Sequence, residues 1–274
     1  MALDASFERS KSLSQRLYRL RNFQSKDFWA MVFARPMTIL MLLPIADVAW
    51  VTPNLITAAS VATKIGGIAA LAWMPGYWGG VLGAILVNLG LVLDNMDGTL
   101  ARYRDTSSYV GYYLDKSVDI ICLAGIFLAI AWRAYQGTQE SIDLMLPFAG
   151  FAGASAAAYC KWVASKVETD LNLLHHMKAG TLEDFARGRI DQNPIELPPS
   201  RSLADWGKFL FDSLKSIFLF NEVDIFFFLA LALVLDKLWL FSQVMCSFYA
   251  LGLIIGPALF FFNLRKRVKS DGLE

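Results

Sequence analysis

The sequence predicts an all-α polytopic membrane protein, with six transmembrane helices preceded by an N-terminal interfacial amphipathic helix. Apolar residues make up 56% of the chain and the mean hydropathy is +0.45, which is more than an ordinary soluble domain carries. The apolar residues fall in runs of about 20, the length that crosses a hydrocarbon core about 30 Å thick. The formal net charge is only +1, so composition indicates no nucleic-acid partner.

Residues 1–50 form the first predicted region, an N-terminal amphipathic and interfacial segment. Within it, residues 6–35 carry apolar side chains at helical spacing among arginines and lysines, a pattern typical of a helix that lies in the membrane interface. A solvated tail is the alternative. The following residues up to Trp50 are apolar but contain Pro36 and Pro44, so we expect an interrupted, partly inserted segment and not a full span.

Residues 51–266 form the predicted transmembrane domain, and residues 267–274 form a short tail. The expected spans are 54–73, 79–102, 108–132, 144–166, 217–235 and 238–263. The fourth is rich in glycine and alanine, which allow helices to pack closely. Residues 167–205 are polar and proline-containing, and we expect them to leave the membrane.

Lysine and arginine are distributed unevenly between the predicted loops. The basic segments are the N-terminal tail, residues 103–107, residues 167–215 and the C-terminal cluster. The links with little positive charge are residues 74–78, 133–143 and 236–237. Because positive loops stay in the cytoplasm, we expect both termini and the 103–107 turn on the cytoplasmic side of the cytoplasmic (inner) membrane.

Two neighbouring predicted spans carry acidic residues, although a charge inside a membrane segment is costly and usually functional. These residues are Asp94, Asp97, Asp115 and Asp119. Helical spacing places the first two on one face of their helix and the last two on one face of the next. If the helices pair antiparallel about Thr106, the acids meet at matching depths, since each residue rises about 1.5 Å.

Such a cluster indicates metal ions, because four close carboxylates cannot all be ionised unless cations lie between them. Oxygen ligands of this kind suit Mg²⁺ or Mn²⁺. We therefore predict a two-metal site with ions about 3.5–4 Å apart. The alternative is structural ion pairing with basic side chains nearby, namely Lys64, Arg102, Arg104 and Lys116.

The residues around these acids follow a fixed pattern, D-x2-D-G-x2-A-R-x8-G-x3-D-x3-D, which residues 94–119 fill at every specified position. With this motif the chain resembles the CDP-alcohol phosphotransferases (class I), integral membrane enzymes of phospholipid synthesis. A weaker similarity covers residues 52–55 and the order of the predicted spans. The resemblance implies a homodimer.

The resemblance also implies a reaction in which an alcohol attacks a CDP-activated phosphoryl group and releases CMP. It assigns metal binding to Asp94, Asp97, Asp115 and Asp119, and the role of catalytic base to Asp119. It implies that the nucleotide contacts are Thr52, Pro53, Asn54, Leu55, Gly98, Ala101, Arg102, Ser108 and Gly111. For Ser108, Pro53 and Asn54 a simpler interpretation is that they start helices.

The substrates are less well defined by the sequence. We favour CDP-diacylglycerol as the donor, with CDP-choline or CDP-ethanolamine reacting with diacylglycerol as the alternative. Lys161 and Lys166 lie near the cytoplasmic end of the fourth predicted span, where some members of the family that the chain resembles carry basic residues for phosphorylated acceptors. The alternative is that these lysines only extend to the membrane surface. Asn221, at the start of the fifth predicted span, suits an amine acceptor instead. The two indications conflict, and the acceptor stays open.

Two other protein classes share some of these features. Membrane prenyltransferases bind a diphosphate through Mg²⁺ and aspartate-rich helices, but their acidic repeats lack the adjacent glycine, alanine and arginine. A cation transporter would use the acids to line a path, which leaves Gly98 and Arg102 unexplained. CMP release from a CDP-linked donor separates the proposed enzyme from both.

Overall fold

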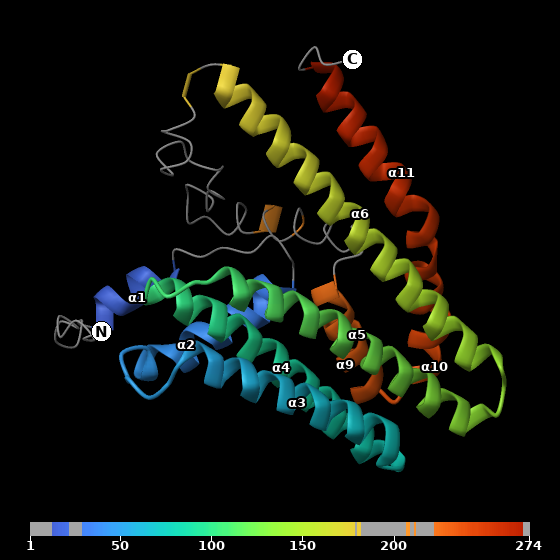
Figure 1. Ribbon diagram of the computed structural model, residues 1–274. Helices are drawn as coiled ribbons and strands as arrows, with labels where there is room; N and C mark the ends of the chain where they lie inside the picture. Colours follow the sequence, from blue (N-terminus) through green and yellow to red (C-terminus); the bar gives the residue numbers. More distant parts are fainter. Residues whose placement is uncertain are drawn as a thin grey trace.

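The computed structural model describes residues 13–21, 29–178, 180–181, 207–208, 211 and 222–270. All regular structure in these residues is helical (Figure 1), which confirms the all-α prediction. The helices are α1 (Leu13–Arg21), η1 (Ala30–Ala34), α2 (Arg35–Ile45), α3 (Pro53–Trp73), α4 (Gly76–Tyr103), α5 (Tyr109–Thr138), α6 (Ile142–Lys178), α9 (Glu222–Val234), α10 (Leu238–Leu240), η3 (Phe241–Met245) and α11 (Cys246–Ser270).

Four helices of the described chain are long and apolar enough to cross a membrane: Pro53–Trp73, Gly76–Tyr103, Ile142–Lys178 and Phe241–Lys269. They correspond to the first, second, fourth and sixth predicted spans. The third predicted span coincides with α5 and the described part of the fifth with α9, but neither is among these four. The described part of the fifth predicted span, α9, contains 13 residues, which extend about 20 Å at about 1.5 Å per residue.

The N-terminal region is more continuously helical than its prolines suggest. The chain is helical from Ala30 to Ile45, through η1 and α2. Pro36 follows the π-helical stretch η1 by two residues, a local irregularity of the kind found where a regular helical hydrogen bond is lost, and Pro44 directly precedes the last residue of the helix. Contrary to the prediction, the prolines therefore do not end the helix, but the apolar helix Val32–Ile45 is shorter than the four candidate spans, as expected. α1 is a helix, and its position in the membrane interface stays a prediction.

The first part of the predicted polar excursion is helical. Helix α6 continues past residue 167 and ends only at Lys178, so it contains 37 residues. At about 1.5 Å per residue it is about 55 Å long, well beyond the thickness of a hydrocarbon core. The change in polarity near residue 167 thus falls within α6 and does not mark its end; that residues 167–178 lie outside the membrane stays a prediction. Residues 182–205 lie outside the described residues.

Helix α3 organises the part of the fold that holds the acids. It packs against both α4 and α5, whereas α4 and α5 have little direct backbone contact. The α3–α4 contact is close because small residues line it: a Cβ on Gly67 would lie 2.7 Å from Cγ2 of Val87, and one on Gly83 would lie 2.5 Å from Cγ of Leu71. The acids of the two helices meet as predicted, but the prediction omitted α3, which packs against both helices and joins them.

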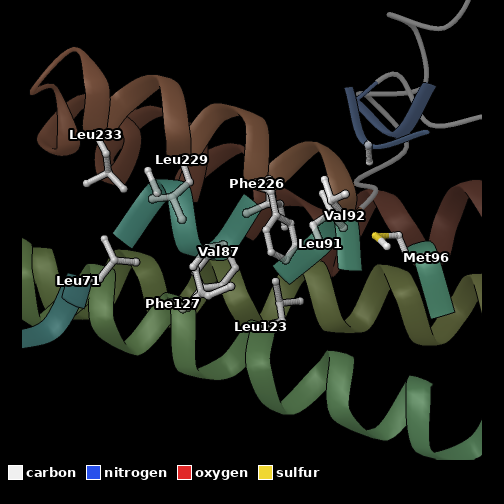
Figure 2. Packing of buried hydrophobic residues seen from close by; sticks show 14 of the residues in the cluster. Leu71, Val87, Leu91, Val92, Met96, Leu123, Phe127, Phe226, Leu229 and Leu233 are labelled. Carbon is white, nitrogen blue, oxygen red and sulfur yellow. The ribbon is translucent and has the colours of Figure 1, made fainter. Parts of the chain in front are cut away.

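A buried apolar cluster connects this bundle with α9. Figure 2 shows side chains of α4, α5 and α9 facing one another in this cluster. The residues include Val87, Leu91, Leu123, Phe127, Phe226 and Leu229. This apolar packing lies in the middle of α4 and α5. The polar residues of the motif therefore lie toward the C-terminal end of α4 and the N-terminal end of α5.

Helices α6 and α11 form a second close pair (Figure 1). A Cβ on Gly153 would overlap the backbone carbonyl of Tyr249, and one on Gly256 would lie 3.1 Å from Cα of Ala157. The small residues of the fourth predicted span therefore permit close packing, as expected. Near the C-terminal ends of the two helices, Arg267 of α11 donates a 2.7 Å hydrogen bond to the side-chain oxygen of Asn172 of α6.

Candidate active site

A cavity of about 320 Å³ opens between the polar ends of α3, α4 and α5. Its lining residues are Pro53, Asn54, Thr57, Asp94, Asn95, Asp97, Gly98, Ala101, Arg102, Thr106, Ser107, Ser108, Gly111, Tyr112, Asp115 and Lys116. Of the predicted nucleotide contacts, only Thr52 and Leu55 are absent from the lining. Of the four predicted aspartates, only Asp119 is absent.

Two helices begin at this cavity, and side chains cap both. The Thr52 hydroxyl accepts a 3.2 Å hydrogen bond from the backbone N–H of Leu55 at the start of α3. The Ser108 hydroxyl accepts a 3.0 Å bond from the N–H of Gly111 at the start of α5. Thr52 and Ser108 are thus N-caps, and Ser108 also lines the cavity. The N-terminal ends of the two helices bring partial positive charge to it, which favours an anion.

Three of the predicted aspartates come together in the cavity. One carboxylate oxygen from each of Asp94, Asp97 and Asp115 lies within 4.8 Å of the other two. Asp97 is buried, and the other two are partly exposed. Three carboxylates at this separation form a suitable oxygen-donor set for one divalent cation such as Mg²⁺ or Mn²⁺.

Hydrogen bonds orient Asp97 within this group. Its Oδ2 accepts a 2.5 Å bond from the hydroxyl of Thr57, and its Oδ1 accepts a 2.5 Å bond from the N–H of Gly98. Bonds of this kind fix the direction of a metal ligand. Sequence reasoning did not single out Thr57. The available signal was its spacing, because Thr57 lies one helical turn after Pro53 and so shares its face of α3.

Asp119 pairs with two lysines, each of which also pairs with one of the other aspartates. The ammonium group of Lys64 lies 2.9 Å from Oδ1 of Asp94 and 3.0 Å from Oδ1 of Asp119. The ammonium group of Lys116 lies 3.0 Å from Oδ2 of Asp119 and 3.2 Å from Oδ2 of Asp115. The structural ion pairing weighed as an alternative to metal binding is therefore present, with Lys64 and Lys116 as the partners.

Arg102 places a guanidinium group beside the small residues of the motif. A Cβ built on Gly98 would lie 3.4 Å from Nη1 of Arg102, so the arginine side chain extends back along its own helix over Gly98. Both residues line the cavity, together with Ala101. A planar guanidinium group next to an open surface is suited to bind phosphate through two parallel hydrogen bonds.

Arg104 ties the turn after α4 to the segment before α3. Its guanidinium donates hydrogen bonds to the backbone carbonyls of Ala46 at 2.7 Å, Val48 at 2.9 Å and Val51 at 2.6 Å. Burial lowers the pKa of Arg104 from its ordinary value. The three carbonyls fix the entry to α3, and hence Thr52, relative to the end of α4.

The N-terminal helix joins the same arrangement through Asp47. Oδ2 of Asp47 lies 2.7 Å from Nε of Arg16 in α1, and Oδ1 accepts a 2.8 Å hydrogen bond from the hydroxyl of Tyr103 at the end of α4. The predicted interfacial segment thus contacts the helix that carries the motif. It supports the site structurally.

The predicted acceptor residues do not reach the cavity. Lys166 is exposed and pairs at 3.0 Å with Asp170 on its own helix, and Lys161 is also exposed. Neither lines the cavity. Asn221 lies outside the described residues. The lysines are therefore surface residues of α6 in this structure.

The fold and the site together define a class, a helical protein of membrane-spanning composition with a carboxylate-rich cavity suited to phosphate groups. Residues 50–167 match the family model of the CDP-alcohol phosphatidyltransferases, so this stretch is a domain of that family and the chain is an enzyme that transfers substituted phosphate groups. The matched residues include α3, α4, α5 and most of α6. A search of the curated proteins finds no match.

Proposed function

We propose that this enzyme transfers a phosphoryl-alcohol group from CDP-diacylglycerol to an alcohol acceptor and releases CMP, as a step of phospholipid synthesis. The observation that carries this proposal is the grouping of Asp94, Asp97 and Asp115 within 4.8 Å of one another. They lie in a cavity of about 320 Å³ that also contains Arg102. The family match supports the general reaction.

Asp94, Asp97 and Asp115 would hold Mg²⁺ or Mn²⁺. The donor set fits, because all the ligands are carboxylate oxygens and Thr57 and Gly98 already orient Asp97. A bound divalent ion would neutralise the diphosphate and stabilise the leaving phosphate. The two-metal site predicted from the sequence stays a prediction, for which Asp119 is the additional ligand.

The other cavity residues would bind and position the nucleotide. Arg102 would contact phosphate oxygens through its guanidinium group, and the N-terminal ends of α3 and α5 would supply backbone N–H groups near Asn54 and Gly111. Gly98 and Ala101 lack bulk, so the diphosphate can approach the helix closely. Holding donor and acceptor in one geometry supplies much of the rate enhancement in such transfers.

We assign the role of base to Asp119. It lies one helical turn beyond Asp115 on α5, away from the cavity lining. A carboxylate at that position can accept the proton of the attacking hydroxyl once the acceptor has bound. The exposed Lys116, whose side chain is 52% exposed, is the partner that would give way to the acceptor.

The membrane arrangement completes the proposal. If α5 forms the third crossing and residues 217–235, which include α9, form the fifth, these two and the four candidate spans would take the chain across the membrane six times, with both termini in the cytoplasm. The cavity would then open to the cytoplasm, because its lining includes the basic turn between α4 and α5. The resemblance further suggests a homodimer in the inner membrane.

Release of CMP by the purified protein tests this function. CDP-diacylglycerol should be combined with inositol phosphate, glycerol phosphate and serine, and CDP-choline or CDP-ethanolamine with diacylglycerol. We expect one pair to release CMP, EDTA to abolish the release, and Mg²⁺ or Mn²⁺ to restore it. Asp97→Asn should also abolish it, whereas Asp105→Asn, which changes an acid that does not line the cavity, should not. Undiminished turnover in chelator would contradict the proposal.

A further inference from the structure

Lys64 is a charged residue placed in the interior of the α3–α4–α5 bundle. It is only 1% exposed, and it does not line the cavity. Its ammonium group lies about equally close to acids on two different helices, 2.9 Å from Asp94 on α4 and 3.0 Å from Asp119 on α5. A buried ammonium is strongly unfavourable unless it is paired, so these two contacts fix its position.

The packing around Lys64 leaves its side chain little freedom. A Cβ on Gly90 of α4 would lie 2.5 Å from Cγ of Lys64, so the glycine provides the space that the lysine side chain occupies. Ser60, one turn earlier on α3, donates a 2.8 Å hydrogen bond to the carbonyl of Gly90 and holds the two helices together there. The ammonium group therefore cannot withdraw without a change in the α3–α4 contact.

The charges of the cluster show what this lysine does. The four aspartates carry four negative charges when ionised, and Lys64 and Lys116 neutralise two of them. One divalent ion among Asp94, Asp97 and Asp115 would offset the remaining two, even before the Arg102 guanidinium group in the same cavity is counted. A second divalent ion beside Asp119 would give an excess of positive charge and would have to approach the Lys64 ammonium group.

We propose that Lys64 is an internal cation that takes the place of a second metal ion at Asp119, so that the chain binds one divalent ion tightly and another only weakly. The inference rests on the proposed metal site at Asp94, Asp97 and Asp115. Lys64 is then a positioning residue. It holds Asp119 on α5 in register with Asp94 on α4 whether or not a metal is bound.

Titration with Mn²⁺ tests this inference, with free Mn²⁺ followed by electron paramagnetic resonance on the full-length protein in detergent. We expect the unsubstituted protein to bind one Mn²⁺ tightly and a second at least tenfold more weakly. Lys64→Met keeps the length of the side chain but removes its charge, and it should tighten the second site to within a few-fold of the first. Lys166→Met, the control at an exposed lysine of α6 that pairs with Asp170 and does not line the cavity, should leave the tenfold difference in place.

The outcomes separate this inference from the proposed function. Two sites of equal affinity in the unsubstituted protein would refute the role of Lys64 and leave the metal site intact. Absence of any bound Mn²⁺ would refute the metal site itself. If Lys64→Met does not fold, Asp119→Asn decides the matter: the tight Mn²⁺ should persist within about threefold, since Asp119 is not one of its ligands. Loss of the tight site in that variant would overturn the inference.

Discussion

Replacement of Thr57 by valine tests whether the bond that orients Asp97 matters for metal binding. The substitution keeps the branched shape but removes the hydroxyl that donates to Oδ2 of Asp97 at 2.5 Å. A hydrogen bond to a charged group contributes about 1.5–3 kcal/mol, and loss of such a partner typically lowers metal affinity about 10–100-fold. Because the N–H of Gly98 still holds the other oxygen, we expect a loss of about 10–30-fold.

Thr63→Val is the matched control for this experiment. Both threonines lie on α3 and can bond the carbonyl four residues earlier, Thr57 to Pro53 at 3.1 Å and Thr63 to Ala59 at 2.7 Å. Thr63 does not line the cavity. The Mn²⁺ affinity and the rate of CMP release should fall in Thr57→Val and stay within about twofold in Thr63→Val. Equal values for the two variants would refute the assigned role of Thr57.

Three further predictions concern the base, the helix packing and the topology. Asp119→Asn should lower turnover about 10²–10⁴-fold, whereas metal-dependent CDP binding, measured by calorimetry, should persist. If this variant loses CDP binding as severely as Asp97→Asn does, Asp119 is not mainly a base. Gly153→Ala should destabilise the protein by about 1–3 kcal/mol in thermal unfolding, because its Cβ meets the Tyr249 carbonyl, whereas Gly137→Ala, with nothing nearby, should be neutral. In a variant without native cysteines, a cysteine at Thr106 should react with a thiol reagent added on the cytoplasmic side. A cysteine introduced in the 139–140 loop should react with the reagent added on the opposite side, and the reverse pattern would refute the topology.

The sequence predicts the helices and the acidic motif well because both depend on local spacing. Asp94 and Asp97 are three residues apart, and Asp115 and Asp119 are four apart, so any helix containing them presents each pair on one face. Thr52 and Ser108 are likewise recognisable as residues that begin helices. These features require no knowledge of how the helices are arranged in space.

The relation between the two acidic helices cannot be obtained in this way. Antiparallel pairing about Thr106 accounts for the depth of the acids, but it omits α3, which packs against both helices. The contacts of Thr57 with Asp97 and of Lys64 with Asp119 join residues 40 and 55 positions apart. Spacing within one helix carries no information on such contacts, so the sequence suggested Lys64 as an alternative partner without showing that it lies between two acids.

The carbonyl contacts of Arg104 bear on where the catalytic domain begins. The family match starts at residue 50, but two of the three carbonyls that Arg104 binds belong to Ala46 and Val48. A fragment cut at the family boundary would lose both acceptors, together with the contact between Asp47 and Tyr103. The stretch that matches the family model and the unit that folds therefore have different limits, and expression of an isolated domain should start upstream of α2.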